Sequence, residues 1–268
     1  MNSDTGDLQM EIIDKIKNFF RFKQKLISYM LILALIPLLV VSVYSYSSAS
    51  SSAEEIWMSN LEAIAHQKET VVEDWFTERI GDLEVVRNNH DIKYGTTILE
   101  SSSNQTQVEE EIEIVEEVFD DFINAYGVYL SLYTLYPNGT VSAVATKTGE
   151  TAIVAKGDDL SDVDYYTALN THTSDATYSY ISDFRLAVTT GDVIIAVARN
   201  VYADEDNADF VGIVVGLLDL QHITDVMQDT HGLGDTGETY LVNEDFEWVS
   251  QSKYGEMDLL SDVISQQG

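Results

Sequence analysis

Val128–Thr146 has the sequence VYLSLYTLYPNGTVSAVAT, and this stretch decides the fold class. Apolar and polar residues alternate on both sides of Pro137-Asn138-Gly139, three residues typical of a tight turn. The pattern predicts two antiparallel strands joined as a hairpin. Further β-rich runs follow it, whereas the residues before it have helical spacing. The sequence therefore predicts an α+β fold with an antiparallel sheet.

The segment before this hairpin has the spacing of amphipathic helices. We expect one long stalk helix from Ala53 to His90, a break at Glu100–Gln107 (ESSSNQTQ), and another helix from Val108 to Tyr126. Apolar residues on the stalk helix recur at helical spacing: Trp57, Leu61, Ile64, Val72, Trp75, Ile80, Leu83 and Val86.

The segment after the hairpin contains short helices and β-rich runs. Short helices are predicted at Asp164–Asn170 (DYYTALN) and Gln221–Thr230 (QHITDVMQDT). Strands are predicted within Ala176–Phe184, Asp192–Tyr202 and Phe210–Leu220, and a further hairpin within Glu238–Ser252. An acidic loop, Ala203–Asp209, joins the second and third of these strands.

One segment is predicted to cross a membrane. Leu26–Ser48 (LISYMLILALIPLLVVSVYSYSS) has no charge and is long enough to span a hydrocarbon core of about 30 Å. Basic residues precede it and none follows it directly, so we expect a single-pass anchor. Residues 1–25 would be cytoplasmic and the bulk of the chain extracytosolic. A cleaved signal peptide, ending near Ser48-Ala49-Ser50, is the alternative.

The composition is strongly acidic, with 46 Asp and Glu against 14 Lys and Arg and a formal net charge of −32. Such a surface repels nucleic acid, so no nucleic-acid partner is expected. It also favours a saline, halophilic setting in which salt screens the self-repulsion of the folded chain. An acidic protein from an ordinary medium is the alternative. The absence of cysteine excludes disulfides and thiolate metal sites.

Gly232, Gly234 and Gly237 have the G-x-G-x-x-G spacing of a pyrophosphate-binding loop. Such a loop follows a strand and begins a helix. Here a predicted helix precedes the glycines and a predicted strand follows them, and Asp235 and Glu238 add negative charge where phosphate would bind. The glycines are better explained as residues of a helix-to-strand turn with positive φ.

No catalytic or metal-binding motif is found in the sequence. The five histidines form no pair at helical spacing, and neither G-x-S-x-G nor a P-loop occurs. Lys156–Tyr165 (KGDDLSDVDY) is rich in Asp but lacks the glycine and terminal Glu of an EF-hand loop. We therefore predict no enzyme activity, no cofactor and no metal ion.

A group of tyrosines and one acid is the remaining candidate site. Tyr165 and Tyr166 lie in a predicted short helix, Tyr178 and Tyr180 alternate along the next strand, and Asp219 ends a very apolar strand. Tyrosine has a flat apolar face and a polar tip, which suits a pocket for a small polar ligand. An acid at a strand end can pair with a ligand ammonium. The alternative is that these tyrosines are simply core residues.

From Ser52 onward the chain resembles the double Cache sensor family, the extracytosolic ligand-binding regions of chemoreceptors and sensor kinases. The resemblance rests on Val71–Val86 (VVEDWFTERIGDLEVV), the DYYTAL segment, the strand FVGIVVGLLDL and Gly232–Trp248 (GLGDTGETYLVNEDFEW). It implies a stalk helix and a PAS-like, membrane-distal module over residues 52–230. Residues 231–268 would begin a second, membrane-proximal module that is incomplete, and we expect the chain to be a fragment or truncated.

The resemblance also implies a ligand site. Many family members that bind amino acids have Trp-Tyr in the short helix, a Tyr on the next strand and a late Asp. The matching positions here are Tyr165 in place of the Trp, Tyr166, Tyr180 and Asp219.

The family's Arg that holds the ligand carboxylate is missing, because Asp162 and Val163 occupy that neighbourhood. An amine, or another neutral or cationic ligand, therefore fits better than an α-carboxylate.

The predicted function is the small-molecule sensing region of a transmembrane receptor of the chemotaxis or sensor-kinase type. The resemblance suggests a homodimer along the long helix. A membrane-anchored surface protein with a structural or adhesive role is the alternative. An anchored hydrolase would need a nucleophile and base that the sequence does not provide.

Overall fold

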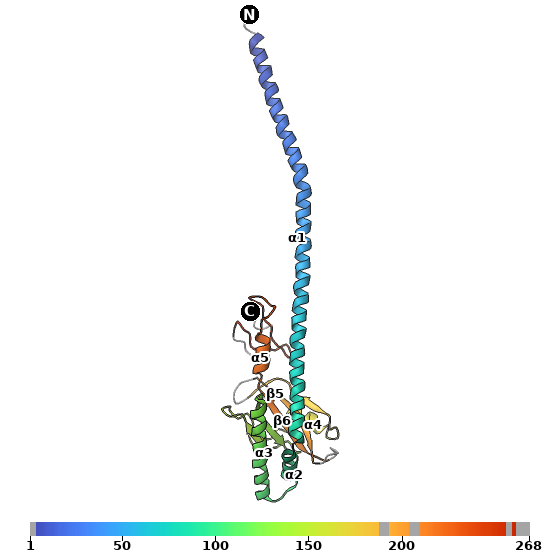
Figure 1. The fold of residues 1–268 in the computed structure, drawn as a ribbon, viewed down its shortest axis with the longest axis vertical. Coiled ribbons are helices and arrows are strands. Elements are labelled where there is room, and N and C mark those ends of the chain that lie inside the picture. The colour runs from blue at the N-terminus through green and yellow to red at the C-terminus, as the bar shows by residue number, and fades with distance from the viewer. Residues whose placement is uncertain (1–3, 188–192, 204–208, 256–258, 261–268) are drawn as a thin grey trace. The chain divides into compact units, whose positions relative to one another are not determined.

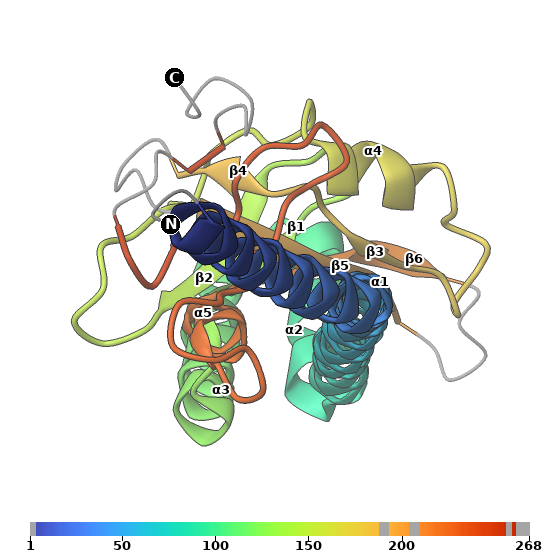
Figure 2. The ribbon, with the colours of Figure 1, turned by 90° about the horizontal axis from the view of Figure 1, so that it is seen from above.

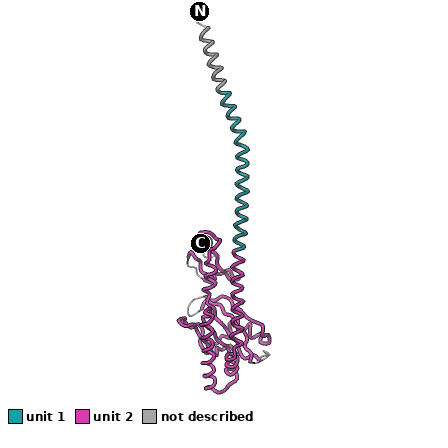
Figure 3. The backbone as a smooth tube through the Cα atoms, in the orientation of Figure 1, with its two compact units in different colours: residues 1–63 teal, residues 64–268 magenta. Residues whose placement is uncertain are grey.

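A computed structural model describes residues 4–187, 193–203, 209–255 and 259–260, with only the backbone described for residues 4–20. The chain forms two compact units, Met1–Ala63 and Ile64–Gly268, which are coloured separately in Figure 3. The acidic loop predicted at Ala203–Asp209 falls largely on residues 204–208, outside the described residues.

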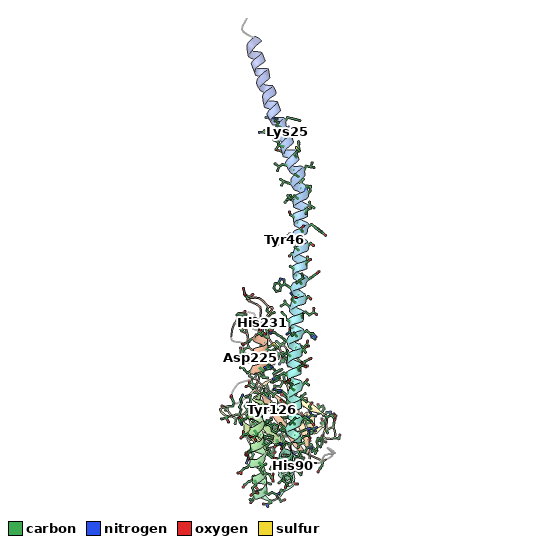
Figure 4. All side chains as sticks on the ribbon, in the orientation of Figure 1. Lys25, Tyr46, His90, Tyr126, Asp225 and His231 are labelled. Atoms are coloured by element: carbon green, nitrogen blue, oxygen red, sulfur yellow. The ribbon has the colours of Figure 1, made fainter. Side chains whose placement is uncertain are left out.

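The predicted membrane span and the predicted stalk form one continuous helix, α1 (Asp4–Asn88), with Pro37 inside it. Among the described residues, this is the helix long and apolar enough to cross a membrane. The large side chains of the span are exposed, as expected for groups that face lipid. Figure 4 shows Lys25 and Tyr46, near the two ends of the span, projecting from the helix. A single-pass membrane chain is therefore supported.

The end of α1 corrects the prediction of a helix to His90. The helix stops at Asn88, and Asn89 begins a separate helix, α2 (His90–Ser101), which the sequence analysis did not predict. The Asn89 side-chain oxygen accepts hydrogen bonds from the amides of Asp91 (2.8 Å) and Ile92 (3.4 Å). This is the usual way in which Asn caps a helix N-terminus.

The predicted hairpin and sheet are confirmed. Six strands pair antiparallel in the order β2-β1-β6-β5-β3, with β4 also on β5. The strands are β1 (Tyr129–Leu135), β2 (Val141–Thr146), β3 (Ser179–Ile181), β4 (Arg185–Leu186), β5 (Val193–Tyr202) and β6 (Phe210–Leu218). The turn between β1 and β2 has Gly139 at φ 88°, a value that favours glycine.

Helices cover the two faces of this sheet unequally (Figures 1 and 2). One face packs against α1, α2, α3 (Gln105–Tyr126) and α5 (Gln221–Gln228), around buried residues such as Leu83, Phe119 and Val197. The other face packs against the short helix α4 (Asp164–Asn170), around residues such as Tyr133 and Val215. This arrangement confirms the predicted α+β class.

Two predicted β segments are shorter than expected. Of Ala176–Phe184, only Ser179–Ile181 forms a strand, β3. The hairpin predicted within Glu238–Ser252 is reduced to a single bridge between Val242 and Trp248. The Asn243 side chain accepts the amides of Asp245 and Glu247 in the turn, and backbone bonds from Asn243 to Glu247 (3.1 Å) and from Val249 to Leu241 (2.9 Å) join the two arms.

The glycine segment forms the predicted turn after α5. Gly232 and Gly234 have φ of 82° and 75°. Gly237 is required for another reason, because a Cβ there would lie 2.4 Å from the carbonyl oxygen of Leu233. The prediction of positive φ is therefore confirmed for Gly232 and Gly234 and is wrong for Gly237. The predicted division into a distal module up to residue 230 and a second module from residue 231 stays a prediction.

Candidate ligand-binding site

Two of the predicted site residues, Tyr165 and Tyr166, lie in the short helix α4 and pack against the sheet. Tyr165 is fully buried and Tyr166 is 8% exposed, and Leu169 packs on the same face as Tyr165, four residues away. The Tyr165 hydroxyl lies 2.8 Å from the hydroxyl of Tyr133 on β1, so the two phenols share a hydrogen bond. Helix and sheet are thus joined by a buried polar contact as well as by apolar packing.

Both of these phenols are held in the neutral form. Burial raises the pKa of Tyr133 well above its ordinary value, and the neighbouring Tyr165 raises it further. Burial also raises the pKa of Tyr165, although Tyr133 and Arg185 act in the opposite direction. Neutral hydroxyls both donate and accept hydrogen bonds, which is the property that recognition of a small polar ligand needs.

A cation and a carboxylate lie beside Tyr165. The Arg185 guanidinium carbon is 5.1 Å from the centre of the Tyr165 ring, and Arg185 Nη1 is 3.7 Å from Asp164 Oδ1. The Asp183 amide donates to the other oxygen of Asp164 at 3.2 Å. Asp164 Oδ1 itself is buried and receives no hydrogen bond from the part of the chain that the structure describes.

Arg185 is the residue of this group that the sequence analysis missed. It lies on the two-residue strand β4, far along the chain from the position where the family Arg was sought. Its place beside α4 depends on the pairing of β4 with β5, which no local pattern reveals. The only available signal was that basic residues are rare in this chain, with 14 in all.

Tyr180 and Tyr166 interact with different groups. Tyr180 is on β3, and its pKa is raised by burial and then by the charges of Asp164 and Asp183. It therefore shares Asp164 with Tyr165. Tyr166 instead donates its hydroxyl to the carbonyl of Pro137, at 2.8 Å, in the turn between β1 and β2.

Asp219 has a separate set of partners. It follows β6, and its Oδ1 accepts the amide of Gln221 at 2.9 Å. Its Oδ2 lies 3.5 Å from the ammonium of Lys147. Neither partner interacts with the tyrosines through the contacts described above. The structure thus brings Tyr165 and Tyr180 together around Asp164, whereas Tyr166 and Asp219 contact other groups.

Two cavities lie elsewhere in the second unit. One, of about 420 Å³, is lined by residues of α1, Met227 and Glu238–Leu241. The other, of about 580 Å³, is lined by Phe76, Ile181–Phe184, Val242–Asp245 and Glu247 among others. Neither is lined by the four predicted residues, so these residues stay a prediction as a ligand site.

A family model for the Cache domain matches residues 47–265. The chain belongs to the Cache domain family. This confirms the predicted family, and the predicted function as the extracytosolic small-molecule sensing region of a receptor is confirmed with it. Membership also favours sensing over the structural or adhesive alternative. Cache domains are ligand-binding and not catalytic, and the absence of enzyme activity in this chain stays a prediction.

Solved Cache-type structures share this fold at low sequence identity. The ligand-binding domain of the Campylobacter jejuni chemoreceptor Tlp3, in complex with 4-methylisoleucine, is 16% identical with a TM-score of 0.56, over 79% of this chain and 75% of that one. The domain of the Pseudomonas aeruginosa amino-acid chemoreceptor PctC, in complex with GABA, is 14% identical with a TM-score of 0.51, over 76% and 78%. No curated protein sequence matches the chain.

Among the described residues, no group of three or more His, Asp or Glu is arranged to hold a metal ion. The prediction that the chain needs no metal stays a prediction. The candidate group combines phenols, one guanidinium and carboxylates, and its role in binding a small polar molecule stays a prediction.

Proposed function

We propose that this Cache region senses a small amino-acid-like ligand at the α4 face of the sheet. Solved structures with the same fold hold 4-methylisoleucine, isoleucine or GABA, which supports a ligand of this class. Tyr165 and Tyr180 supply flat rings and hydroxyls, and Tyr133 fixes the Tyr165 hydroxyl. Tyr166 holds α4 against the β1–β2 turn through Pro137.

The observation that carries the proposal is the Arg185–Asp164 pair beside the Tyr165 ring. A guanidinium matches a ligand carboxylate, and a carboxylate matches a ligand ammonium. The missing family Arg had favoured an amine without a carboxylate. Because Arg185 supplies a cation from β4, we now favour a ligand with both charges. Asp164 Oδ1, buried without a hydrogen-bond donor among the described residues, is the acceptor for the ammonium.

Asp219 has a different role in this proposal from the one predicted from the sequence. It was predicted to bind the ligand ammonium, but its carboxylate already contacts Lys147 and the Gln221 amide. We therefore assign it to holding the junction of β6 and α5. Asp164 takes over the contact with the ammonium.

The membrane arrangement is part of the proposal. The N-terminal segment would be cytoplasmic, because Lys15, Lys17, Arg21, Lys23 and Lys25 precede the span and no basic residue directly follows it. The sensing unit would then lie outside the cytosol, where the net charge of −32 suits a saline medium.

A homodimer along α1 is proposed as well. Trp57 and Leu61, just beyond the span and four residues apart, are 55% and 45% exposed. Such an apolar row on one helix face suits contact with a second copy of the helix. The chain has no cysteine, so Leu61→Cys can be cross-linked in membranes. We expect Leu61→Cys to form a disulfide-linked dimer in high yield. Ser59→Cys, on the opposite face of the helix, should form little cross-linked dimer. Equal yields of cross-linked dimer from the two variants would contradict a dimer along this face.

A thermal-shift screen of the full chain in lipid nanodiscs and high salt tests the function. The panel contains amino acids, amines, carboxylates and sugars. We expect a concentration-dependent rise in Tm with a member of the amino-acid group, because a ligand that binds only the folded state stabilises it. A Tm that stays unchanged with every compound would contradict sensing of this ligand class and would favour the structural or adhesive alternative.

A further inference from the structure

Two adjacent residues of β5 hold the segment that connects α4 to β3. Asn200 is fully buried, and its side-chain amide donates to the carbonyls of Leu169 (3.2 Å) and His172 (3.1 Å), at the end of α4. Arg199 is 8% exposed and donates to the carbonyl of Thr177 at 3.2 Å, just before β3. Both ends of the connection are therefore fixed from one strand.

The same two residues are bound to the last turns of α1. Glu84 Oε2 lies 3.0 Å from Arg199 Nη1 and 2.7 Å from Arg87 Nε. Arg87 is 5% exposed, and its Nη1 donates to the backbone carbonyl of Asn200 at 3.1 Å. One carboxylate on α1 thus joins two buried arginines, and through them the backbone of β5.

Burial lowers the pKa of Arg199, and the neighbouring charge of Arg87 lowers it further, while Glu84 acts in the opposite direction. The pKa of Glu84 is lowered overall: partial burial raises it, but the hydrogen bond and charge of Arg87 and the charge of Arg199 outweigh that effect. Arginine suits such a role because its planar group binds several acceptors in fixed directions. The ion pairs that join α1 to β5 are charge-assisted, whereas Arg199 Nε and Asn200 Oδ1 are buried without a hydrogen-bond partner among the described residues.

We propose that Glu84, Arg87, Arg199 and Asn200 form a positioning network that fixes α4 and the approach to β3 relative to the end of α1. Tyr165 lies in α4 and Tyr180 in β3, so the network sets the spacing of the two rings at the candidate site. The same contacts would let a ligand-induced shift of α4 reach α1, and only this last part rests on the proposed function. The four side chains act through α4 and β3 and do not contact the ligand themselves.

Hydrogen exchange of the full chain in nanodiscs tests this without any ligand. The amides of His172, Asp175 and Tyr178 are hydrogen-bonded within the connecting segment and report its opening. In Glu84→Gln we expect these amides to exchange about tenfold faster or more, because one partner of a buried charged network is removed. Arg87→Lys keeps the positive charge but loses the planar guanidinium, so it should increase the exchange rate of these amides by a smaller factor. This second variant keeps the test informative if Glu84→Gln does not fold.

Asp82→Asn is the matched control. Asp82 is also an acid on α1 and pairs with Arg79 at 2.9 Å, but it makes none of these contacts with β5. Its change should leave the exchange of the three amides within about twofold of the unmodified chain. Unchanged exchange in both Glu84→Gln and Arg87→Lys, or equal acceleration in Asp82→Asn, would overturn the proposal. Because no ligand is used, failure of the screen for amino-acid-like ligands would not affect this result.

If a compound from the screen binds, its affinity gives a second readout. Glu84→Gln should weaken it by several-fold more than Asp82→Asn at a similar loss of Tm, because only Glu84 sets the ring spacing. Equal weakening at equal loss of Tm would show a merely structural role and contradict the proposal.

Discussion

At the scale of single residues, the account depends on one guanidinium that lies over a tyrosine ring and on the carboxylate that pairs with it. Asp164 and Arg185 lie beside Tyr165, whereas Asp219 lies with Lys147. The two aspartates therefore have different proposed roles, the first in contact with ligand and the second in holding β6 against α5.

Substitution of these two aspartates separates the roles. Asp164→Asn should weaken a bound amino acid by about tenfold or more, because the charge opposite the ammonium is lost. Asp219→Ala should weaken it by less than about threefold and cost about 1 kcal/mol of stability, through the lost bond to the Gln221 amide. Calorimetric titration and denaturant unfolding measure the two effects. A larger loss of ligand affinity in Asp219→Ala than in Asp164→Asn would contradict these roles and assign the ammonium contact to Asp219.

Alkaline pH should unfold the chain through its buried tyrosines. Burial raises the pKa values of Tyr129, Tyr133 and Tyr165 above the ordinary value of 10.0. Above about pH 10 the unfolded chain therefore loses these protons while the folded chain keeps them, and the free energy of unfolding falls as pH rises. Below that pH the three groups have no effect. Denaturant midpoints between pH 8 and 11, followed with phenolate absorbance, should show phenolate appearing together with unfolding; gradual ionisation with a constant midpoint would contradict this.

At the scale of elements, Lys68 joins α1 to α5 and to the segment after the glycine turn. Its ammonium donates to the carbonyls of Val226 (2.8 Å) and Met227 (3.2 Å) and to the Thr239 hydroxyl (2.8 Å). Burial lowers the pKa of this ammonium, while the charge of Asp229 opposes the shift. The last carbonyls of a helix have no partner within it, so a lysine there satisfies groups that would otherwise need water.

Lys68→Met should lower the stability of this junction. We expect a loss of about 1–2 kcal/mol and faster hydrogen exchange across Gln221–Gln228, because several carbonyls lose their donor. Lys93→Met makes the same chemical change on α2, away from these carbonyls, and serves as the control. Equal exchange of α5 in the two variants would show that Lys68 does not hold the junction.

The elements also show what the sequence could predict. α4 and the β1–β2 hairpin were predicted well, because a tight turn and a short amphipathic run are local signals. α2 was missed because its capping residue, Asn89, lies inside what reads as one long helix. The later hairpin is shorter than predicted, with a bridge between Val242 and Trp248 and cross-arm backbone bonds beside the turn at Asn243. Arg185 was missed because its strand, β4, has only two residues and so gives no alternating pattern to recognise.

At the scale of the whole molecule, the net charge of −32 means that acidic side chains repel one another without enough basic partners. Screening shortens from about 10 Å at 0.1 M salt to about 3 Å at 1 M, so added salt should relieve self-repulsion in the folded chain. We expect the Tm of the full chain to rise over that range by more than in an equally concentrated neutral solute such as sucrose. A Tm that falls with salt, or follows sucrose, would contradict a saline setting.

The central claim is that this Cache region binds a ligand with both charges at the α4 face. Calorimetric titration of the full chain in nanodiscs tests it most directly, with each amino acid or GABA set beside its matching amine and its matching carboxylate. The account predicts that one doubly charged compound binds at least about tenfold more tightly than either singly charged partner, and that Arg185→Gln removes this advantage over the amine. An amine that binds as tightly as its amino acid, or an advantage that survives Arg185→Gln, would contradict it.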